Sequence, residues 1–355
     1  MSKFYPLVVK EVVHETPTAL SIKFVNPDPE VFRYLPGQYL TVKVPVGGEV
    51  LRRAFSLSSA PGLDPELQIT VKCIEGGRAS WHLKKNAKAG QTYEVFPPLG
   101  KFALEPMPKE SRHFVLVGCG SGVTPLFSIL KSVLHYETRS RVTFLYGNRN
   151  REETIFNDEL DRLKADYIER FKLVHVMSRP RPGDEPDRTG RIEGALAQEL
   201  LRTALDSHED EALVFLCGPE GMMQSVQAAL KSLGFPESRV FREHYSAPLP
   251  AETDDAPQDA EYEIVDRTVA VVLEGKTHSV FVKAGKDILQ AVIDKGLDPP
   301  FACQEGVCAT CRAHLDDGLV QMMERDGLSD EEINAGYVLT CQSYPLTDGV
   351  KLEYC

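Results

Sequence analysis

Apolar and polar residues alternate along the first hundred residues, in short segments that are separated by turns rich in Pro and Gly. The segments with this pattern are 5–13, 20–24, 39–44, 67–73 and 92–96. A period of two places successive side chains on opposite faces of a β-strand. Several short strands at this spacing predict a small antiparallel β-barrel, which we assign to residues 1–105.

The hydrophobic pattern changes after residue 106. Residues 113–117 form a continuous apolar run, typical of a buried parallel strand, and residues 126–135 follow with helical periodicity. The same alternation continues with strands predicted at 141–146, 171–177 and 212–216 and helices at 152–165 and 195–205. Strands that alternate with helices predict a doubly wound α/β domain over residues 106–246.

A shift to Pro, Ala and acidic residues after residue 246 predicts a flexible, self-repelling linker at 247–262. Beyond it, strands at 269–273 and 277–282 and a helix at 288–295 indicate a small α+β domain over residues 263–355. The chain is therefore expected to contain three domains. The linker either lets the last domain swing between a flavin-facing and a partner-facing pose or merely wraps the surface, and the sequence does not distinguish the two.

Charge is unevenly distributed along the 355 residues. The net charge is −12, and residues 249–355 contain 21 acidic and 8 basic residues. This acidic sign argues against nucleic acid as a partner. It is compatible equally with a docking face for a basic redox partner and with an ordinary solvated surface. No apolar run approaches the length of a membrane span, so no membrane insertion is expected.

Four cysteines in the last domain carry the strongest chemical signal. Their spacing is C-x4-C-x2-C-x29-C, with the thiols at Cys303, Cys308, Cys311 and Cys341. This is the spacing of a plant-type [2Fe–2S] ferredoxin, so these four residues are predicted metal ligands and the domain is predicted to have a β-grasp ferredoxin fold. A zinc site favours two short cysteine pairs, and only one is present. Disulfides need an oxidising compartment, and the N-terminus has no apolar signal core, so a cytoplasmic location is expected.

Two further motifs suggest nucleotide-containing ligands. Arg53, Phe55 and Ser56 combine a cation, an aromatic ring and a hydroxyl in the barrel, which suits a phosphate, a flat ring and a polar ring edge. Residues 118–125 form a glycine turn between the apolar strand at 113–117 and the following helix. A strand, a glycine turn and a helix N-terminus together form a nucleotide-phosphate site.

These motifs resemble those of the ferredoxin–NADP reductase superfamily. Residues 53–56 are similar to its R-x-Y-S flavin motif, with Phe55 in place of the usual Tyr, and residues 76–80 correspond to its glycine turn near the flavin diphosphate. The glycine turn at 118–125 and the Cys-Gly-Pro turn at 217–219 also resemble those of the superfamily. The resemblance implies FAD contacts at Arg53, Ala54, Phe55, Ser56, Val71, Lys72, Gly77, Ala79 and Ser80.

The same resemblance implies NAD(P)H contacts at Gly118, Gly120, Gly122, Thr124, Arg149, Ser178, Arg179, Cys217, Gly218 and Met222. It places Cys217 near the nicotinamide and Tyr245 near the flavin, and it does not assign a catalytic role to either residue. Arg149 and the Ser178-Arg179 pair favour NADPH over NADH, because they follow strands where a 2′-phosphate would lie. The alternative is that these arginines are solvated loop charges.

The order of the domains resembles that of oxygenase reductases with a C-terminal ferredoxin domain, most closely the reductases of phenylacetyl-CoA epoxidases. The reductases of ketosteroid 9α-hydroxylases, or of another ring hydroxylase or desaturase, are the alternative. The resemblance implies an NAD(P)H oxidoreductase that divides a hydride into two single electrons through FAD and the cluster, for an oxygenase. A redox-sensing binding protein is an alternative of another class, but it has no need for a hydride-donor site.

Overall fold

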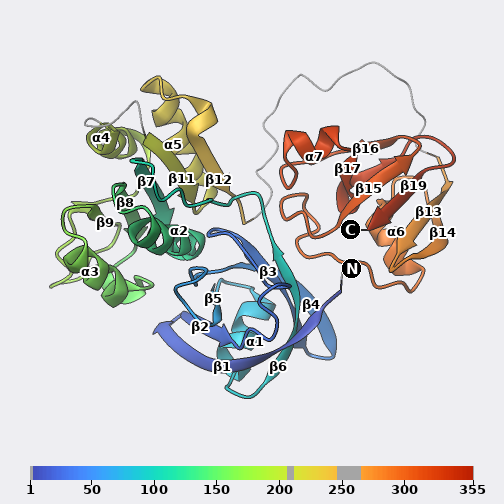
Figure 1. Ribbon diagram of the computed structural model, residues 1–355, viewed down its shortest axis with the longest axis horizontal. Helices are drawn as coiled ribbons and strands as arrows, with labels where there is room; N and C mark the ends of the chain where they lie inside the picture. The colour runs from blue at the N-terminus through green and yellow to red at the C-terminus, as the bar shows by residue number, and fades with distance from the viewer. Residues whose placement is uncertain (1–2, 206–211, 246–264, 355) are drawn as a thin grey trace.

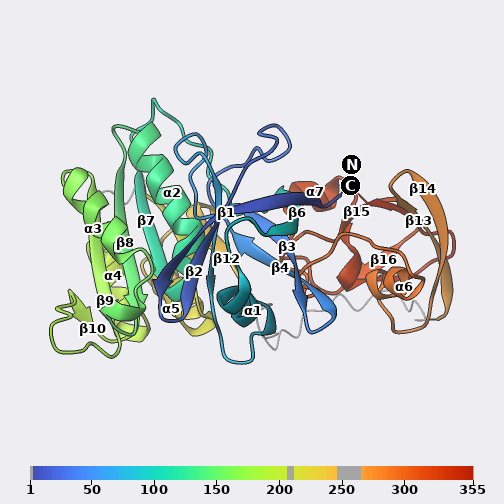
Figure 2. The same ribbon diagram turned by 90° about the horizontal axis from the view of Figure 1, so that it is seen from below.

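The computed structural model describes residues 3–205, 212–245 and 265–354. Within them the chain forms three large sheets, each from a separate stretch of sequence. The three units lie in a row with the first, the barrel, in the middle (Figures 1 and 2). The predicted linker at 247–262 lies outside the described residues. Nowhere in the described ranges does a helix combine the length and the hydropathy that spanning a bilayer requires.

The first unit is an antiparallel barrel. Its sheet has the order β4-β3-β6-β1-β2-β5, and an antiparallel bridge between Leu57 and Ile69 joins its two edges. Alternate side chains from these strands fill one apolar core, so the predicted barrel is confirmed. The elements are β1 (Tyr5–Thr16), β2 (Ala19–Phe24), β3 (Tyr39–Val46), β4 (Glu49–Ser56), β5 (Leu67–Lys72), α1 (Arg78–Asn86) and β6 (Thr92–Leu99).

The second unit is a parallel sheet with the order β10-β9-β8-β7-β11-β12. Helices α2 and α3 share the core on one face, and α4 and α5 share the core on the other, which is the predicted doubly wound arrangement. The strands are β7 (His113–Cys119), β8 (Arg141–Asn148), β9 (Phe171–Met177), β10 (Arg188–Thr189), β11 (Ala212–Cys217) and β12 (Val240–Glu243). The helices are α2 (Val123–Tyr136), α3 (Asn157–Asp166), α4 (Gly194–Leu205) and α5 (Glu220–Ser232), with short 3-10 turns at η1 (Gly120–Gly122), η2 (Arg151–Glu153) and η4 (Glu237–Arg239).

The predicted helix at 152–165 is divided in the structure. A 3-10 turn, η2, precedes it, and α3 begins only at Asn157. Between them Phe156 adopts a left-handed backbone conformation with φ 60°. Its ring is buried and stacks on that of Phe127 in α2, with the ring centroids 4.3 Å apart. Burial of this ring therefore offsets the cost of the unusual backbone and delays the helix start.

The third unit is a mixed five-stranded sheet of order β14-β13-β19-β15-β17, with a separate β16-β18 pair. Helix α6 packs its apolar side on this sheet and shares its core. The arrangement confirms the predicted α+β domain. Its elements are β13 (Arg267–Leu273), β14 (Lys276–Val282), α6 (Ile288–Asp294), β15 (Arg312–Asp317), β16 (Val320–Met322), α7 (Asp330–Asn334), β17 (Tyr337–Leu339), η5 (Thr340–Gln342), β18 (Ser343–Pro345) and β19 (Lys351–Tyr354).

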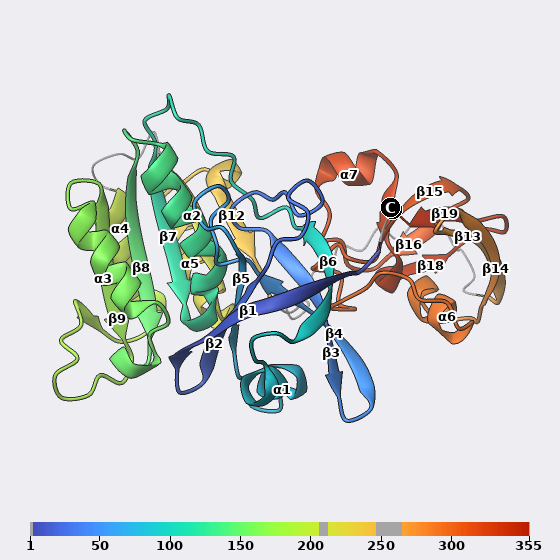
Figure 3. The same cartoon turned by 60° about the horizontal axis from the view of Figure 1, so that its bottom comes forward.

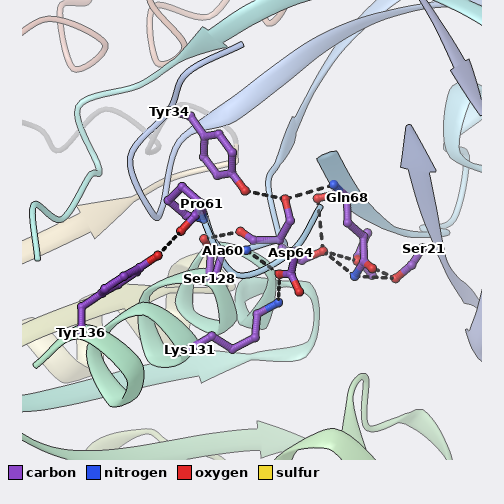
Figure 4. Close-up of polar contacts among 12 residues, drawn as sticks. Ser21, Tyr34, Ala60, Pro61, Asp64, Gln68, Ser128, Lys131 and Tyr136 are labelled. Carbon is purple, nitrogen blue, oxygen red and sulfur yellow. Dashed lines mark hydrogen bonds and ion pairs between the residues drawn. The ribbon is translucent and has the colours of Figure 1, made fainter. Parts of the chain in front are cut away.

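Helix α2 joins the barrel to the parallel sheet, since it lies on the side of the sheet that faces the barrel (Figure 3). Ser128 donates a hydrogen bond of 2.5 Å to the backbone carbonyl of Ser59, and Tyr136 donates one of 2.9 Å to that of Pro61. Lys131 forms an ion pair with Asp64 (Figure 4). These contacts fix α2 to the loop that directly follows the 53–56 motif.

Candidate functional site

The order of the strands in the parallel sheet reverses between β7 and β11, which are hydrogen-bonded neighbours. Both strands end at this point, β7 in the glycine turn and β11 at Cys217. The two turns are in close contact, because a Cβ atom at Gly122 would overlap the carbonyl oxygen of Cys217. Ligands of open α/β sheets bind at the carboxyl ends of strands where the strand order reverses. The glycine turn therefore lies at the expected place for a nucleotide.

The start of α2 suits a phosphate group. No side chain among the described residues caps this helix, and its first turn has no acidic residue. The N–H of Val123 donates within the preceding 3-10 turn and Pro125 has no N–H, so the start of α2 offers an anion the N–H of Thr124 and the helix dipole. Tyr146 of β8 donates a hydrogen bond of 3.2 Å to the carbonyl of Gly120 and supports the turn from below. The described residues thus fit a dinucleotide at this point.

The three polar residues predicted to select NADPH come together on two neighbouring loops. The backbone N–H of Ser178 donates to the carbonyl of Asn148 at 3.0 Å, and that of Arg179 donates to the carbonyl of Arg149 at 2.8 Å. The Arg149 side chain is exposed, with its guanidinium 3.5 Å from Glu153. Arg149 and Arg179, both exposed, thus follow neighbouring strands at the carboxyl end of the sheet.

The predicted FAD residues lie at the ends of β4 and β5 and at the start of α1. Ser56 is buried, whereas the Arg53 side chain is exposed. Helix α1 begins at Arg78 without a side-chain cap or an acidic residue in its first turn. Ser80 instead donates a 3.0 Å hydrogen bond to the carbonyl of Gly77. A cation and a helix N-terminus with free N–H groups fit a diphosphate.

Some predicted contact residues do not point into open space. Val71 and Ala79 belong to the barrel core, and Met222 belongs to the core between the parallel sheet and α5. Only the backbone of such residues can contact a ligand. Lys72 is different, because its amine would lie 3.2 Å from a Cβ atom built on Gly120. Burial lowers the pKa of Lys72, and its amine lies beside the glycine turn.

Tyr245 lies between the flavin motif and the nucleotide turn. Its hydroxyl donates to the carbonyl of Ser121 at 2.9 Å and is 2.9 Å from the hydroxyl of Thr124. The side chains of Ser56 and Cys217 are also within hydrogen-bond reach. Burial raises the pKa of the Cys217 thiol far above its usual value. Cys217 is therefore a neutral thiol that can position a ligand, and it is a poor nucleophile.

The four predicted cluster cysteines converge in two pairs. Cys303 contacts Cys308, and Cys311 contacts Cys341. The backbone N–H of Glu305 donates to the Cys303 sulfur at 3.3 Å, which helps to lower the pKa of that thiol after the larger effect of Cys308. No group of three or more His, Cys, Asp or Glu side chains within the described ranges is arranged around one ion. Two pairs of thiols with N–H donors fit a binuclear cluster.

The three units meet at one cavity of about 440 Å³. The barrel contributes Tyr39 and Lys101 to its lining, the parallel-sheet unit contributes Glu243, and the third unit contributes Cys308 and Ala309. Within the cavity wall, the Tyr39 hydroxyl donates to the carbonyl of Cys308. Sequence reasoning did not assign Tyr39, although it is adjacent to Ser56 in the β3–β4 ladder.

Family models match all three units. Residues 5–104 match the oxidoreductase FAD-binding domain, residues 116–228 the oxidoreductase NAD-binding domain, and residues 271–346 the 2Fe-2S iron-sulfur cluster binding domain. These matches agree with the fit of the described residues to each group. The chain is thus an NAD(P)H oxidoreductase whose cofactors are FAD and a [2Fe–2S] cluster.

Full-length relatives share the same architecture. The chain is 35% identical to a subunit of the 1,2-phenylacetyl-CoA epoxidase of Escherichia coli (strain K12), over 100% of this chain and 98% of the relative. It is 36% identical to the ferredoxin reductase component of 3-ketosteroid-9-alpha-monooxygenase from Rhodococcus rhodochrous, covering 98% and 96%. The fold matches phthalate dioxygenase reductase with a TM-score of 0.58 and 24% identity, over 99% of this chain and 98% of that one. The chain belongs to the family of modular reductases that join an FAD-binding, an NAD-binding and a [2Fe–2S] domain.

Proposed function

We propose that the protein supplies electrons to a separate oxygenase component. NAD(P)H loses a hydride and becomes NAD(P)⁺, the two electrons leave the protein one at a time, and a proton is released to water. FAD supplies the two-electron to one-electron conversion when bound, and the cluster supplies the one-electron exit. Plant-type clusters have potentials of about −400 mV, which is low enough to reduce an iron oxygenase.

The observation that carries this proposal is the cavity at which all three units meet. It places residues of the flavin-binding barrel, the nucleotide domain and the cluster loop in one wall. A binding protein that only senses redox state has no need to bring a hydride-donor site to its cluster. The arrangement therefore favours electron transfer over sensing.

The residues of this chain have distinct proposed roles. The glycine turn and the start of α2 bind the dinucleotide phosphates, and Cys217 orients the nicotinamide as a neutral contact. Arg53 and the start of α1 bind the FAD diphosphate. Tyr245 occupies the space between the two ligands, where it is bonded to Ser121. We also propose that all the residues named above as FAD or NAD(P)H contacts bind these ligands. We further propose that the domains end at residues 105 and 246 and that the linker ends at residue 262.

The preferred nucleotide is proposed to be NADPH. The support is that Arg149 and Arg179 lie on loops joined by a backbone hydrogen bond of 2.8 Å. Two cations at one sheet edge suit the extra phosphate. We also propose a cytoplasmic location, which is supported by three cysteines outside the cluster set that form no disulfide among the described residues, Cys73, Cys119 and Cys217.

The acceptor is proposed to be a phenylacetyl-CoA epoxidase, as the name of the Escherichia coli relative indicates. A ketosteroid 9α-monooxygenase, or another ring hydroxylase or desaturase, is the alternative, and the similar identity of the Rhodococcus rhodochrous relative supports the ketosteroid enzyme. Both acceptors should therefore be assayed. Electron delivery coupled to product formation with one purified oxygenase, and not with the other, would identify the partner.

The central experiment is an anaerobic titration with NADPH and, in parallel, NADH. Flavin bleaching is followed optically and the cluster by low-temperature EPR. The expected result is bleaching by NADPH followed by a [2Fe–2S] signal. In Cys308→Ser, which lacks one proposed ligand, bleaching should persist while reduction of cytochrome c is lost. Undiminished cytochrome c reduction in this variant would show that the cluster is not the exit.

A further inference from the structure

Two adjacent arginines on β4 have different surroundings. Arg53 belongs to the flavin motif and is exposed, whereas the Arg52 side chain is only 6% exposed. Successive residues of a strand point to opposite faces, so Arg52 is directed away from its neighbour. It pairs in the ladder with Lys43 of β3. The burial of Arg52 thus requires partners from another part of the chain.

Those partners come from the loop that precedes the cluster cysteines. The guanidinium of Arg52 donates to the backbone carbonyl of Pro299 and forms an ion pair with Asp298. It lies over the ring of Phe301, 4.2 Å from the centroid. Pro299 and Phe301 are four and two residues from the first cluster ligand, Cys303. Arg52 therefore holds the segment that leads into the cluster loop.

Two barrel residues complete this contact. The Lys43 amine is 3.4 Å from Asp298, and it lies 4.3 Å from the centroid of the Phe4 ring. Phe4 also covers the Arg52 guanidinium at 5.0 Å. Asp298 thus receives two cations from one hairpin, and both cations contact aromatic rings, which adds to the attraction.

The same face of the hairpin contacts the cluster loop itself. Tyr39, Thr41 and Lys43 are alternate residues of β3 and so share one face with Arg52. Tyr39 donates to the carbonyl of Cys308, and the hydroxyls of Thr41 and Thr310 are 3.1 Å apart. Arg52 therefore contacts the ferredoxin domain at one end of this face, and Tyr39, which pairs with Ser56 in the ladder, contacts it at the other end.

We propose that Arg52 is a positioning residue that clamps the ferredoxin domain to the flavin barrel through Asp298, in the pose from which the cluster receives electrons. The inference rests on the proposed function, and it adds no chemical step. The clamp acts through distance, because electron transfer weakens steeply as donor and acceptor separate. Loss of the clamp should slow the internal transfer and leave hydride transfer unchanged.

The test uses the full-length holoprotein with Arg52→Met, Asp298→Asn and the double variant. Arg52→Met keeps an apolar chain between the two rings. Asp298 is 70% exposed, so Asp298→Asn leaves both domain cores intact. Lys10→Met is the matched control, because Lys10 forms an exposed ion pair with Glu66, another residue of the barrel.

Anaerobic stopped-flow reduction with NADPH separates flavin bleaching from cluster reduction. Each single variant should slow the cluster phase about tenfold. The double variant should be slower than Arg52→Met by much less than another tenfold, because the Arg52–Asp298 pair is lost in both single variants and only the Lys43–Asp298 pair is lost in addition. The control should match the wild type in both phases. A cluster phase at the wild-type rate in both single variants would overturn the proposal, as would an equal slowing of bleaching.

Small-angle X-ray scattering of the oxidised proteins gives a readout that does not depend on turnover. The radius of gyration should increase in Arg52→Met and Asp298→Asn and stay constant in Lys10→Met. An unchanged scattering profile in both single variants would overturn the clamp. If the wild type fails to reduce its flavin, the proposed function is wrong, but the scattering result still decides whether Arg52 holds the domain.

Discussion

The flavin barrel meets its two neighbours through interfaces of different chemistry. Toward the nucleotide domain, Ser128 and Tyr136 of α2 donate to backbone carbonyls in a barrel loop, and the Lys131–Asp64 ion pair lies beside them. Toward the ferredoxin domain, the main contact is Arg52 with Asp298, whose side chain is 70% exposed. Both interfaces have buried carbonyl acceptors, because Arg52 and Tyr39 donate to those of Pro299 and Cys308, but the second leaves the acid of its ion pair largely in water.

This difference bears on which domain can move. A buried carbonyl that loses its donor carries the full cost of desolvation, so α2 cannot leave the barrel without a large penalty. An exposed carboxylate that loses its cation is rehydrated at once, so its ion pair is sensitive to salt, even though the Arg52 partner is buried. The contact of α2 with the barrel is therefore the rigid interface with respect to salt, and the contact with the ferredoxin domain is the salt-sensitive one.

The largest expected effect concerns the rigid interface. Ser128→Ala leaves the carbonyl of Ser59 without its donor and should lower the free energy of unfolding by about 1–3 kcal/mol. The matched control is Ser132→Ala, because Ser132 is buried on the same helix and its hydroxyl has no hydrogen-bond partner within the described ranges. Thermal unfolding of both variants measures the difference. Equal losses in the two would contradict the assigned role of the Ser128 contact.

A smaller effect is expected at the cluster contact. Tyr39→Phe removes the hydrogen bond to the carbonyl of Cys308 and should cost about 1 kcal/mol of stability. The EPR signal of the reduced cluster should also shift, because that carbonyl belongs to a ligand residue. Thr41→Val is the control at the other hydroxyl of this face. An unchanged EPR spectrum in Tyr39→Phe would show that the contact does not influence the cluster.

A change in salt concentration should distinguish the two interfaces without any mutation. Raising the ionic strength from about 0.05 M to about 0.5 M shortens the screening length to a few ångströms, so the Asp298 ion pairs weaken. The cluster phase of the wild type should slow about two- to threefold, whereas flavin bleaching at saturating NADPH should not change. In Asp298→Asn the cluster phase should lose this salt dependence. Its persistence there would assign the effect to other charges.

The smallest effect is a pH dependence at the rigid interface. Burial raises the pKa of Glu15, which hydrogen-bonds to Ser21 near α3. The folded protein therefore holds this proton more tightly than the unfolded chain does. The stabilisation is full below the pKa of an unfolded glutamate and is lost as the pH rises through the folded pKa.

Glu15→Gln cannot titrate and serves as the comparison. The melting temperature of the wild type should therefore rise relative to Glu15→Gln between about pH 7 and about pH 5. All other titrating groups are common to the two proteins, so they cancel in this difference. Melting curves that stay parallel over the whole range would show that Glu15 titrates alike in the folded and unfolded chains.

Local spacing explains most of what could be predicted from the sequence. The cysteine intervals C-x4-C-x2-C fix three thiols in one loop, and the glycine turn directly follows a buried strand. Both features depend only on residues that are close in the chain. In the structure the cysteines come together, and the glycine turn lies at the carboxyl end of the strand that precedes it. The three-domain fold followed from hydrophobic periodicity for the same reason.

Contacts between distant segments could not be predicted. The alternation of β4 indicates that Arg52 and Arg53 have opposite directions, but nothing local identifies Asp298 as the partner. The start of α3 was missed because Phe156 packs on Phe127 of another helix, and this tertiary contact overrides helical propensity. Tyr39 was overlooked for the same reason, since its role depends on the position of the ferredoxin domain.

The position of Arg52 between the Phe4 and Phe301 rings also bears on the order in which the domains fold and dock. One covering ring, Phe4, is among the first residues of the chain, whereas the other, Phe301, comes 249 residues after Arg52. At translation rates of about 5–20 residues per second, Arg52 waits on the order of 10–50 s for its acidic partner. A barrel that folds during synthesis therefore does so with this cation still hydrated. Docking through Asp298 is a later event, because Asp298 is made 246 residues after Arg52.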